Sequence, residues 1–363
     1  MKVTVTQENL SKALNIVSRV ASSHTSLPIL NNILIKTENN QLILSATNLE
    51  IAITESINAK VDKDGILTIP AKLMTDFISQ LPKNSISMTL SDNKLKITSG
   101  NYKSVINTTI ADEFPVIPTV RGKTKFKISS ELFKTAAQQT TLVASNDTSR
   151  PILTGAYLHT HNGNLFITTT DGYRLAEKKI MKQEDEISVI IPVSTINDVL
   201  RVLTDEVTEI DIKINNEQIE FKIDSVVINS RLIDGNFINY RSLIPSKTEN
   251  SAILDKTEFL RIIKISELFA RESAGSIVIK ADEKSQVLKI NSITNEFGEN
   301  TAEIEGEISG DGQITLNSRY LIDAINCITE ERVKFNFSGK LAPSLLTAEK
   351  DIDYKHIIMP VKS

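Results

Sequence analysis

Two histidines, His159 and His161, are the side chains in this sequence whose spacing most suggests chemistry. Residues two positions apart on a strand share one face, and two imidazoles on one face are a possible metal-binding pair. Neither a cysteine nor a cluster of acids accompanies them in the sequence. The pattern therefore favours two surface side chains on the flank of a hairpin, and we predict no metal site.

Three aspartates are candidates for acid–base catalysis. Asp76, Asp198 and Asp323 each follow, by seven residues, the first apolar residue of a segment that leads into a helical pattern. All three lie in the middle of a predicted helix. A shared structural bond to a neighbouring strand or loop is therefore a better interpretation than catalysis.

The other candidates for chemistry are a cysteine and a glycine-containing segment. Cys327 lies on the apolar side of a predicted helix with no base arranged beside it, which favours a buried small side chain over a nucleophile. The segment Gly310-Asp311-Gly312 is followed by neither a helix nor a lysine, so it indicates a turn and not a phosphate loop. The sequence therefore predicts no catalytic residue and no cofactor.

The composition describes a chain of 363 residues with a net charge of −4 and 40% apolar residues. This length predicts two to three domains, and no apolar run approaches the ~18 residues of a membrane span. The first residues alternate and soon become polar, unlike a signal peptide, and a single cysteine fits a reducing compartment. We therefore predict a cytoplasmic protein that does not hold nucleic acid by overall charge alone.

Self-comparison of the sequence reveals a threefold repeat. A short strand, a capping residue and an amphipathic helix recur, and the caps are Thr6, Ser129 and Asp255, whose side-chain oxygens accept an orphan backbone N–H. A second helix follows in each copy, and alternating runs typical of strands fill the rest. We predict an α+β fold of three tandem copies of one domain. The predicted domains are residues 1–122, 123–248 and 249–363.

One turn recurs between two of these copies. The strand-like run that ends at Thr170 is followed by Asp171-Gly172, a pair that favours a tight turn because glycine accepts a positive φ. Asn48 occupies the position of Asp171 in the first copy. We therefore expect the same turn in both copies.

Cations recur on all six predicted helices. If these helices face a common side, their cations line one concave wall inside an otherwise acidic protein. Such a wall would follow DNA phosphates loosely and without sequence preference. The residues are Lys12, Arg19, Lys72, Lys134, Arg201, Arg261, Lys264 and Arg319.

Six short motifs, in order along the chain, give the sequence a resemblance to a known family. They are Leu27-Pro28-Ile29-Leu30, Thr47-Asn48-Leu49-Glu50, Ala111-Asp112-Glu113-Phe114-Pro115, Thr170-Asp171-Gly172-Tyr173-Arg174-Leu175-Ala176, Leu232-Ile233-Asp234-Gly235-Asn236-Phe237 with Tyr240-Arg241, and Met359-Pro360-Val361. Together with the repeat and the length, they make the whole chain resemble the β subunits of bacterial DNA polymerase III, the β sliding clamps.

The resemblance implies three similar DNA-clamp domains per chain and a head-to-tail homodimer that closes into a ring, with helices lining the bore. It implies a protein without a catalytic site that encircles double-stranded DNA without sequence specificity and tethers the replicative polymerase subunit for processivity. An ATP-driven clamp loader opens such rings. Other DNA polymerases and repair proteins that carry clamp-binding peptides are further implied partners.

Family members bind these peptides, commonly a Gln followed by spaced Leu and Phe, in an apolar groove between the second and third domains. The apolar side chains would make a dry socket, and two arginines would meet the polar groups of the peptide. The groove carried over to this chain would consist of Arg150, Ile152, Leu153, Thr170, Gly172, Tyr173, Arg174, Leu175, Leu243, Leu341, Pro343, Ile357, Met359, Pro360 and Val361.

The resemblance also implies the joint of the ring and further contacts with DNA. An edge strand at 104–108 of one chain would pair with part of 302–308 of another, and Ile106 would pack near Leu268 and Phe269. His24 and the pair Asn146 and Asp147 fall in loops that touch DNA in relatives.

Departures from the family pattern bear on peptide preference. Ile238 stands where many relatives have Pro, and Ser242 stands at a position that is often Arg. The alternatives to a ring are a monomeric peptide-binding adaptor of the same fold and an enzyme that uses an acid or His159 and His161 at a domain boundary. A sequence-specific DNA reader disagrees with the acidic charge and with the absence of a reading motif.

Overall fold

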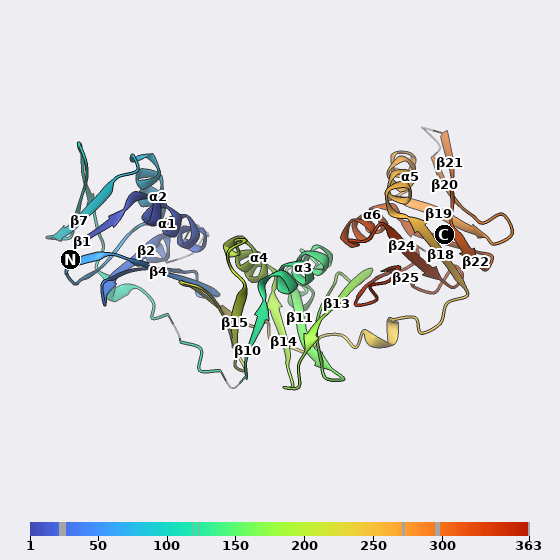
Figure 1. Ribbon diagram of the computed structural model, residues 1–363, viewed down its shortest axis with the longest axis horizontal. Coiled ribbons are helices and arrows are strands. Elements are labelled where there is room, and N and C mark those ends of the chain that lie inside the picture. Colours follow the sequence, from blue (N-terminus) through green and yellow to red (C-terminus); the bar gives the residue numbers. More distant parts are fainter. Residues whose placement is uncertain (22–26, 118, 123, 271–272, 295–297, 362–363) are drawn as a thin grey trace. The chain divides into compact units, whose positions relative to one another are not determined.

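The computed structural model describes residues 1–21, 27–117, 119–122, 124–270, 273–294 and 298–361 (Figure 1). The chain forms two compact units. The first contains Met1–Glu131 and Asn197–Leu232, and the second contains Leu132–Ile196 and Ile233–Ser363. Residues of the middle repeat therefore belong to both units.

The three repeats share one order of elements: a strand, a long helix, four principal strands, a second helix and three strands. The first contains β1 (Lys2–Thr6), α1 (Gln7–Ala21), β2 (Asn32–Glu38), β3 (Gln41–Thr47), β4 (Ile51–Asn58), β5 (Lys60–Lys63), β6 (Ile66–Pro70), α2 (Ala71–Gln80), β7 (Ser85–Ser91), β8 (Lys94–Ser99) and β9 (Tyr102–Asn107). The second contains β10 (Thr124–Ser129), α3 (Ser130–Thr140), β11 (Gly155–His161), β12 (Asn164–Thr170), β13 (Arg174–Lys182), β14 (Ser188–Pro192), α4 (Val193–Val202), β15 (Glu209–Ile214), β16 (Gln218–Ile223) and β17 (Val226–Arg231).

The third repeat contains β18 (Asn250–Asp255), α5 (Lys256–Phe269), β19 (Ser276–Asp282), β20 (Val287–Thr294), β21 (Gly298–Glu305), β22 (Glu307–Ser309), β23 (Gly312–Asn317), α6 (Ser318–Cys327), β24 (Arg332–Phe337), β25 (Ser344–Ala348) and β26 (Tyr354–Ile358). Short 3₁₀ helices lie at Pro28–Asn31, Ala111–Glu113, Thr141–Val143, Pro151–Thr154 and Arg241–Leu243. The predicted α+β fold with two helices per repeat is confirmed.

Antiparallel sheets connect strands of different repeats. In the first unit, β17 pairs with β4, which makes one eight-stranded sheet in the order β10-β15-β16-β17-β4-β3-β2-β6. In the second unit, β13 pairs with β26, which makes a nine-stranded sheet in the order β14-β11-β12-β13-β26-β25-β24-β18-β22. The remaining strands form a five-stranded sheet, β5-β1-β7-β8-β9, and a four-stranded sheet, β21-β20-β19-β23.

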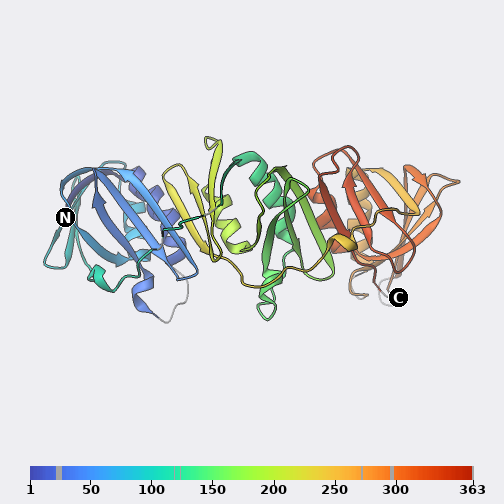
Figure 2. The ribbon, with the colours of Figure 1, turned by 90° about the horizontal axis from the view of Figure 1, so that it is seen from below.

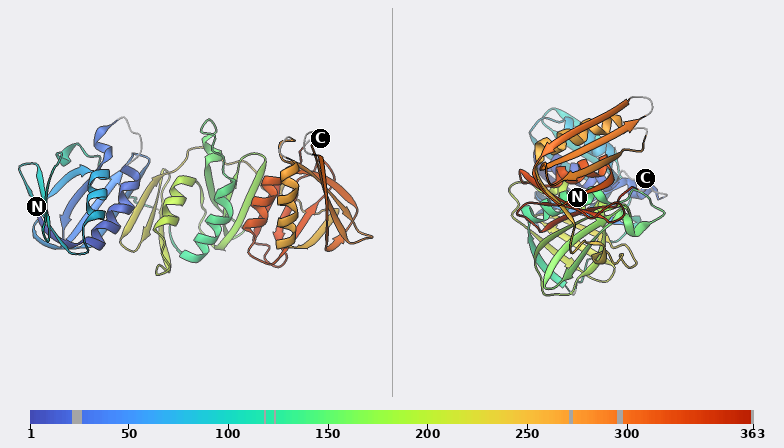
Figure 3. Two further views of the ribbon diagram at one scale, coloured as in Figure 1. Left: turned by 90° about the horizontal axis from the view of Figure 1, so that it is seen from above. Right: turned by 90° about the vertical axis from the view of Figure 1, so that its right-hand side faces the viewer.

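The long helix of the first repeat is held by an apolar stripe. Leu10, Leu14 and Val17 recur at helical spacing and are fully buried, and α1 packs against α2, β3 and β4. Figure 2 shows the strands of this blue part in front of its helices. In the third repeat α5 packs in the same way against α6, β20 and β21, and the two helices lie side by side in Figure 3.

The predicted cap of α5 is confirmed. Asp255 Oδ1 accepts a hydrogen bond from the backbone N–H of Glu258 at 2.8 Å, which satisfies a donor that the first helical turn leaves unpaired. No helix in the described ranges is long and apolar enough to cross a membrane.

A buried carboxylate in β4 makes the first unit sensitive to pH. Glu55 is 5% exposed, and its Oε2 receives no hydrogen bond from the residues that the structure describes. Burial raises the pKa of Glu55 to about 6, an effect that the nearby charge of Lys12 only partly offsets. The folded state therefore binds this proton more tightly than the unfolded chain, so stability falls as the pH rises towards 6.

We expect Glu55→Gln to remove this loss. The variant should be about 2 kcal/mol more stable than the parent at pH 7.5 and equal to it at pH 4, as measured by urea denaturation. Glu38→Gln, a change at an exposed glutamate, is the control and should leave the pH profile unchanged. An identical pH profile for the parent and Glu55→Gln would contradict this assignment.

Candidate functional site

The turn between β12 and β13 is built by side chains that bond its backbone. Asp171 Oδ1 accepts hydrogen bonds from the N–H groups of Tyr173 at 2.8 Å and Arg174 at 3.0 Å. Thr170 Oγ1 donates to the carbonyl of Arg174 at 2.6 Å and accepts from the N–H of Gly172 at 3.1 Å. Gly172 has a φ of +95°, which is the conformation expected from the sequence.

The first repeat contains the same turn between β3 and β4. Asn48 Oδ1 accepts from the N–H groups of Glu50 at 3.0 Å and Ile51 at 2.8 Å. Thr47 Oγ1 donates to the carbonyl of Ile51 at 2.9 Å. Leu49 stands in the place of Gly172 with a φ of +77°. The predicted correspondence of Asn48 and Asp171 is therefore confirmed.

The side chain of Arg174 is fixed by two carboxylates. Its Nε lies 3.1 Å from Asp171 Oδ2, and its Nη1 lies 2.5 Å from Asp323 Oδ2. The guanidinium also covers the ring of Tyr320, with 4.4 Å to the centroid, and the side chain is only 11% exposed. Arg174 therefore serves first to join β13 to α6, and little of it is left to meet a ligand.

The shared structural role predicted for the three aspartates is only partly correct. Asp323 bonds to another element through Arg174, as expected. Asp198 instead pairs with Arg201 one turn later in its own helix, at 2.8 Å. Asp76 lies exposed on α2. The helical frame fixes the position of each aspartate, whereas its partner depends on which side chains lie opposite.

The last described residues run along this turn. Leu175 pairs with Ile357, and Arg174 pairs with Ile358. The ladder continues past the strand, because the N–H of Met359 donates to the carbonyl of Tyr173 at 2.9 Å. Residues 354–359 and 173–178 therefore form one continuous antiparallel ladder.

Tyr240, in the segment that precedes the third repeat, is buried against the nine-stranded sheet. Its hydroxyl donates to Glu177 Oε2, accepts from Thr168 Oγ1 at 3.0 Å and lies 2.8 Å from His159 Nε2. Arg241 Nη2 lies 3.0 Å from the same carboxylate, which is 1% exposed. The ring of Tyr240 packs with Leu175 and Ile357, so it supports the floor of the predicted groove.

The expectation that both histidines lie on the surface is wrong for His159. This residue is 5% exposed, and its ring stacks with those of Tyr157 at 4.4 Å and Phe166 at 5.6 Å between centroids. Burial lowers the pKa of His159 to about 4, and the charge of Arg241 acts in the same direction. His161 is exposed, and no metal-binding cluster is found among the described residues.

The other chemical candidates have ordinary surroundings. Cys327 is half-buried, and burial raises the pKa of its thiol to about 11, so it is a poor nucleophile at neutral pH. Asp147, in the loop suggested to touch DNA, binds Arg150 Nε at 2.8 Å.

The predicted groove residues divide into a floor and a rim. Leu175, Ile357 and Thr170 are buried at 2–3% exposure and form the floor. Tyr173 is 62% exposed and Met359 is 37% exposed, and the two are hydrogen-bonded neighbours at the end of this ladder. Arg150 Nη1 lies 3.8 Å from the Cβ position of Gly172. The further residues are half-buried or exposed within the same unit: Ile152, Leu153, Leu243, Leu341, Pro343, Pro360 and Val361.

The cations predicted to face DNA lie exposed on the helices, although several have acidic neighbours. Arg201 pairs with Asp198, and Arg261 pairs with Glu258. Arg319 pairs with Glu267 at 3.1 Å. The remaining exposed members are Lys12, Arg19, Lys72, Lys134 and Lys264. His24 lies outside the described residues.

The residues predicted for the ring joint lie in the edge strand β9 and at the end of α5. Ile106 of β9 is buried at 9% exposure, and its neighbour Val105 is 61% exposed. Leu268 at the end of α5 is 53% exposed, and Phe269 is half-buried. Val105 lies within the predicted edge segment 104–108 and points its side chain to the opposite face from Ile106, as alternation along a strand requires.

Comparison with known proteins matches the whole chain. Models of the DNA polymerase III β subunit family match its N-terminal domain to residues 1–118, its central domain to residues 127–239 and its C-terminal domain to residues 241–362. A β sliding clamp of Staphylococcus aureus is 28% identical over 376 residues, with all of both chains covered.

Solved structures agree with these matches. The DNA polymerase sliding clamp of Bacillus subtilis has a TM-score of 0.95 at 26% identity, covering 100% of this chain and 99% of that one. The DNA polymerase III subunit beta of Pseudomonas aeruginosa has a TM-score of 0.95 at 26% identity, covering 100% of each chain.

We expect Tyr240→Phe to destabilise the second unit by about 1–3 kcal/mol, because it leaves the buried Glu177 and His159 without a hydroxyl partner. Tyr157→Phe is the matched control, since it removes a hydroxyl whose bond to Ser188 lies at the surface. Urea denaturation of the two variants and the parent measures the difference. Equal stability of Tyr240→Phe and Tyr157→Phe would show that the hydrogen bonds of the Tyr240 hydroxyl do not stabilise the fold.

Proposed function

Because this chain belongs to the family of bacterial DNA polymerase III β subunits, we propose that two copies close head to tail into a ring around duplex DNA. The family assignment makes the chain a β sliding clamp, a processivity subunit that serves a DNA polymerase and is not itself an enzyme. Beyond the family assignment, we propose the ring, its partners and the residues that contact them.

The observation that supports ring closure is a pattern of strand pairing that occurs at both contacts between repeats. The last strand of the second repeat, β17, pairs with the fourth strand of the first repeat, β4. The last strand of the third repeat, β26, pairs in the same way with the fourth strand of the second, β13. By the same rule β9 of one copy would pair with β21 of another. Both are terminal strands of their sheets in the described part of the chain, so a second copy can supply each partner.

Charge favours the pairing of unlike edges. The edge formed by β8 and β9 exposes Lys94 and Lys103, whereas β21 exposes Glu299 and Glu305. Two β9 edges would bring lysines together, and two β21 edges would bring glutamates together. Opposite charges on adjacent strands attract, and like charges repel, so head-to-tail closure is the favoured arrangement.

The proposed domains are residues 1–122, 123–248 and 249–363, so that a ring of two chains contains six. Exposed cations on the six helices of each chain would face the DNA. Pairs such as Arg201 with Asp198 leave a weak net attraction, which suits a clamp that slides along DNA and does not bind one sequence. We place this activity in the cytoplasm, where an ATP-driven loader would open the ring.

The groove at the turn after β12 would receive the peptides of the replicative polymerase, of other DNA polymerases and of repair proteins. Its floor of Leu175 and Ile357 is apolar and supported from beneath by Tyr240. Its rim offers Tyr173 and Met359, an aromatic and a flexible side chain that adapt to different apolar anchors.

The first test is the mass in solution. One chain is 40.2 kDa, and we expect light scattering to give about twice that mass across a dilution series. Val105→Glu should shift the equilibrium toward the monomer, because it adds a carboxylate to the edge that faces β21. Ile352→Glu changes an equally exposed residue away from the edge and serves as the control. A monomer at every concentration would favour the peptide-binding adaptor.

The groove is tested with a fluorescent peptide that contains a Gln followed by spaced Leu and Phe. Tyr173→Ala and Met359→Ala should each weaken its binding about tenfold, as expected for exposed anchors of a small interface. The control Ile352→Ala should bind as the parent does, and all variants should keep the parent mass. Parental affinity in both groove variants would refute the assignment. Leu175 is unsuited to this test because its burial would confound binding with stability.

A further inference from the structure

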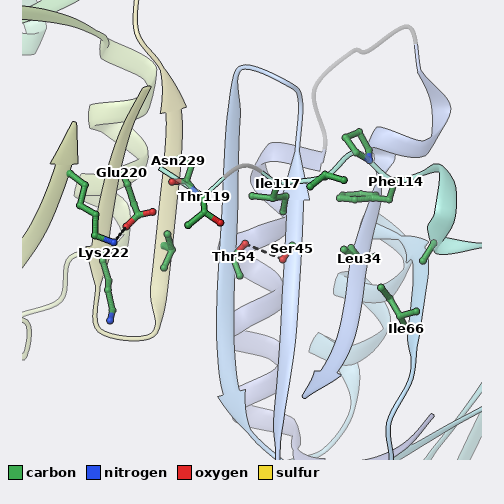
Figure 4. Close-up of a pocket in the computed structure, with 15 residues that line it drawn as sticks. Leu34, Ser45, Thr54, Ile66, Phe114, Ile117, Thr119, Glu220, Lys222 and Asn229 are labelled. Carbon is green, nitrogen blue, oxygen red and sulfur yellow. Dashed lines mark hydrogen bonds and ion pairs between the residues drawn. The ribbon is translucent and has the colours of Figure 1, made fainter. Parts of the chain in front are cut away.

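A pocket of about 630 Å³ lies on the face of the eight-stranded sheet that is opposite α1 (Figure 4). Leu34, Ser45 and Thr54 line it from β2, β3 and β4, and Asn229 lines it from β17. The segment that follows the 3₁₀ helix Ala111–Glu113 closes one side of it. The remaining lining residues are Ile66, Ala111, Phe114, Pro115, Val116, Ile117, Thr119, Lys213, Glu220, Lys222 and Val227.

We call the pairing of β17 with β4 the first joint and the pairing of β13 with β26 the second joint. The pocket lies at the first joint, in the place that Tyr240 fills at the second. Leu34, Ser45 and Thr54 correspond to Tyr157, Thr168 and Glu177, each 123 positions later in the sequence. Thr168 and Glu177 are the residues that bond the Tyr240 hydroxyl. The pocket therefore has the same position on the sheet as the buried tyrosine.

The strand register gives the same correspondence. Asn229 pairs with Ala52 where β17 meets β4, and Ile357 pairs with Leu175 where β26 meets β13. Ile357 and Leu175 are the residues on which Tyr240 packs. The first joint therefore has a polar and a small residue at the positions where the second has two large apolar ones.

The segments at 114–117 and 237–240 share a phenylalanine and differ at the position of the buried tyrosine. Phe237 lies three residues before Tyr240, and Phe114, which is buried, lies three residues before Ile117. Ile117 therefore stands where the second segment has its tyrosine. It brings no hydroxyl to the sheet.

One polar atom in the wall of the pocket is left without a partner. Asn229 is 7% exposed, and among the described residues its Oδ1 receives no hydrogen bond. Ser45 and Thr54 bond each other at 3.0 Å, and Glu220 is held by Lys213 at 2.5 Å. A buried amide atom without a partner costs about 1–3 kcal/mol, which a ligand hydroxyl in the pocket would recover.

We propose that this pocket binds a phenolic ring. The ring would pack against Ile117, which lies between Phe114 and Asn229 in Figure 4, and the hydroxyl would bond the side-chain amide of Asn229. A hydroxyl both donates and accepts, so it satisfies the buried amide atom in either orientation of the amide. The ring can come from a free phenol or from a tyrosine of another protein, and the site is independent of the proposed ring closure.

The test uses p-cresol, the side chain of tyrosine as a free molecule, and saturation-transfer NMR on the full chain. We expect p-cresol to bind, and toluene, which lacks the hydroxyl, to bind about three to ten times more weakly. Asn229→Leu should remove this preference. Ile117→Tyr should abolish p-cresol binding, because the new side chain fills the pocket as Tyr240 fills its counterpart.

A peptide of residues 236–242 of this chain, which contains Tyr240, distinguishes the two sources of the phenolic ring. Tighter binding of this peptide than of p-cresol assigns the pocket to a protein segment, and equal or weaker binding assigns it to a free phenol. The proposal is overturned if p-cresol does not bind, if toluene binds as tightly, or if Ile117→Tyr and Asn229→Leu both bind p-cresol as the parent does.

Discussion

Backbone pairing between strands of different repeats is the interaction on which this structure depends. The eight-stranded and the nine-stranded sheets each combine strands of two repeats, which are joined by the pairs β17 with β4 and β13 with β26. The ladder that continues to Met359 exists because this pairing aligns segments far apart in the sequence. The groove floor, the position of Tyr240 and the burial of Glu177 all follow from that alignment.

The two joints share this geometry and differ in chemistry. At the second joint, Leu175, Ile357 and Leu345 form an apolar surface that is continuous with the rim. At the first joint, Asn229 and Glu220 take the corresponding positions in the register. The repeated fold thus has one backbone geometry at both joints and different side chains on the corresponding faces, at positions that the strand ladder does not require.

Much of this architecture could be predicted from the sequence, because helical spacing and turn chemistry are local. The cap at Asp255, the turn at Asp171 and its copy at Asn48 were all correct. Contacts between distant residues were predicted only through the family resemblance, which places Leu175 and Ile357 in one groove, and not from local patterns. His159 was expected at the surface, since nothing near it in sequence shows that Tyr240 will cover it. Arg174 was expected to meet a ligand, although Asp323 holds it.

The anchored segment at Tyr240 has a mechanical consequence for the proposed ring. Within one chain, β13 and β26 are tied by a covalent connection that is itself bonded to the sheet, so a broken pair meets its partner again at high effective concentration. A contact between β9 and β21 of two copies has no such tether. The strand pairs inside a chain would therefore re-form after a transient opening. The proposed ring would open at the contact between β9 of one copy and β21 of the other. A loader need only separate one such contact, while the opposite contact keeps the two molecules together.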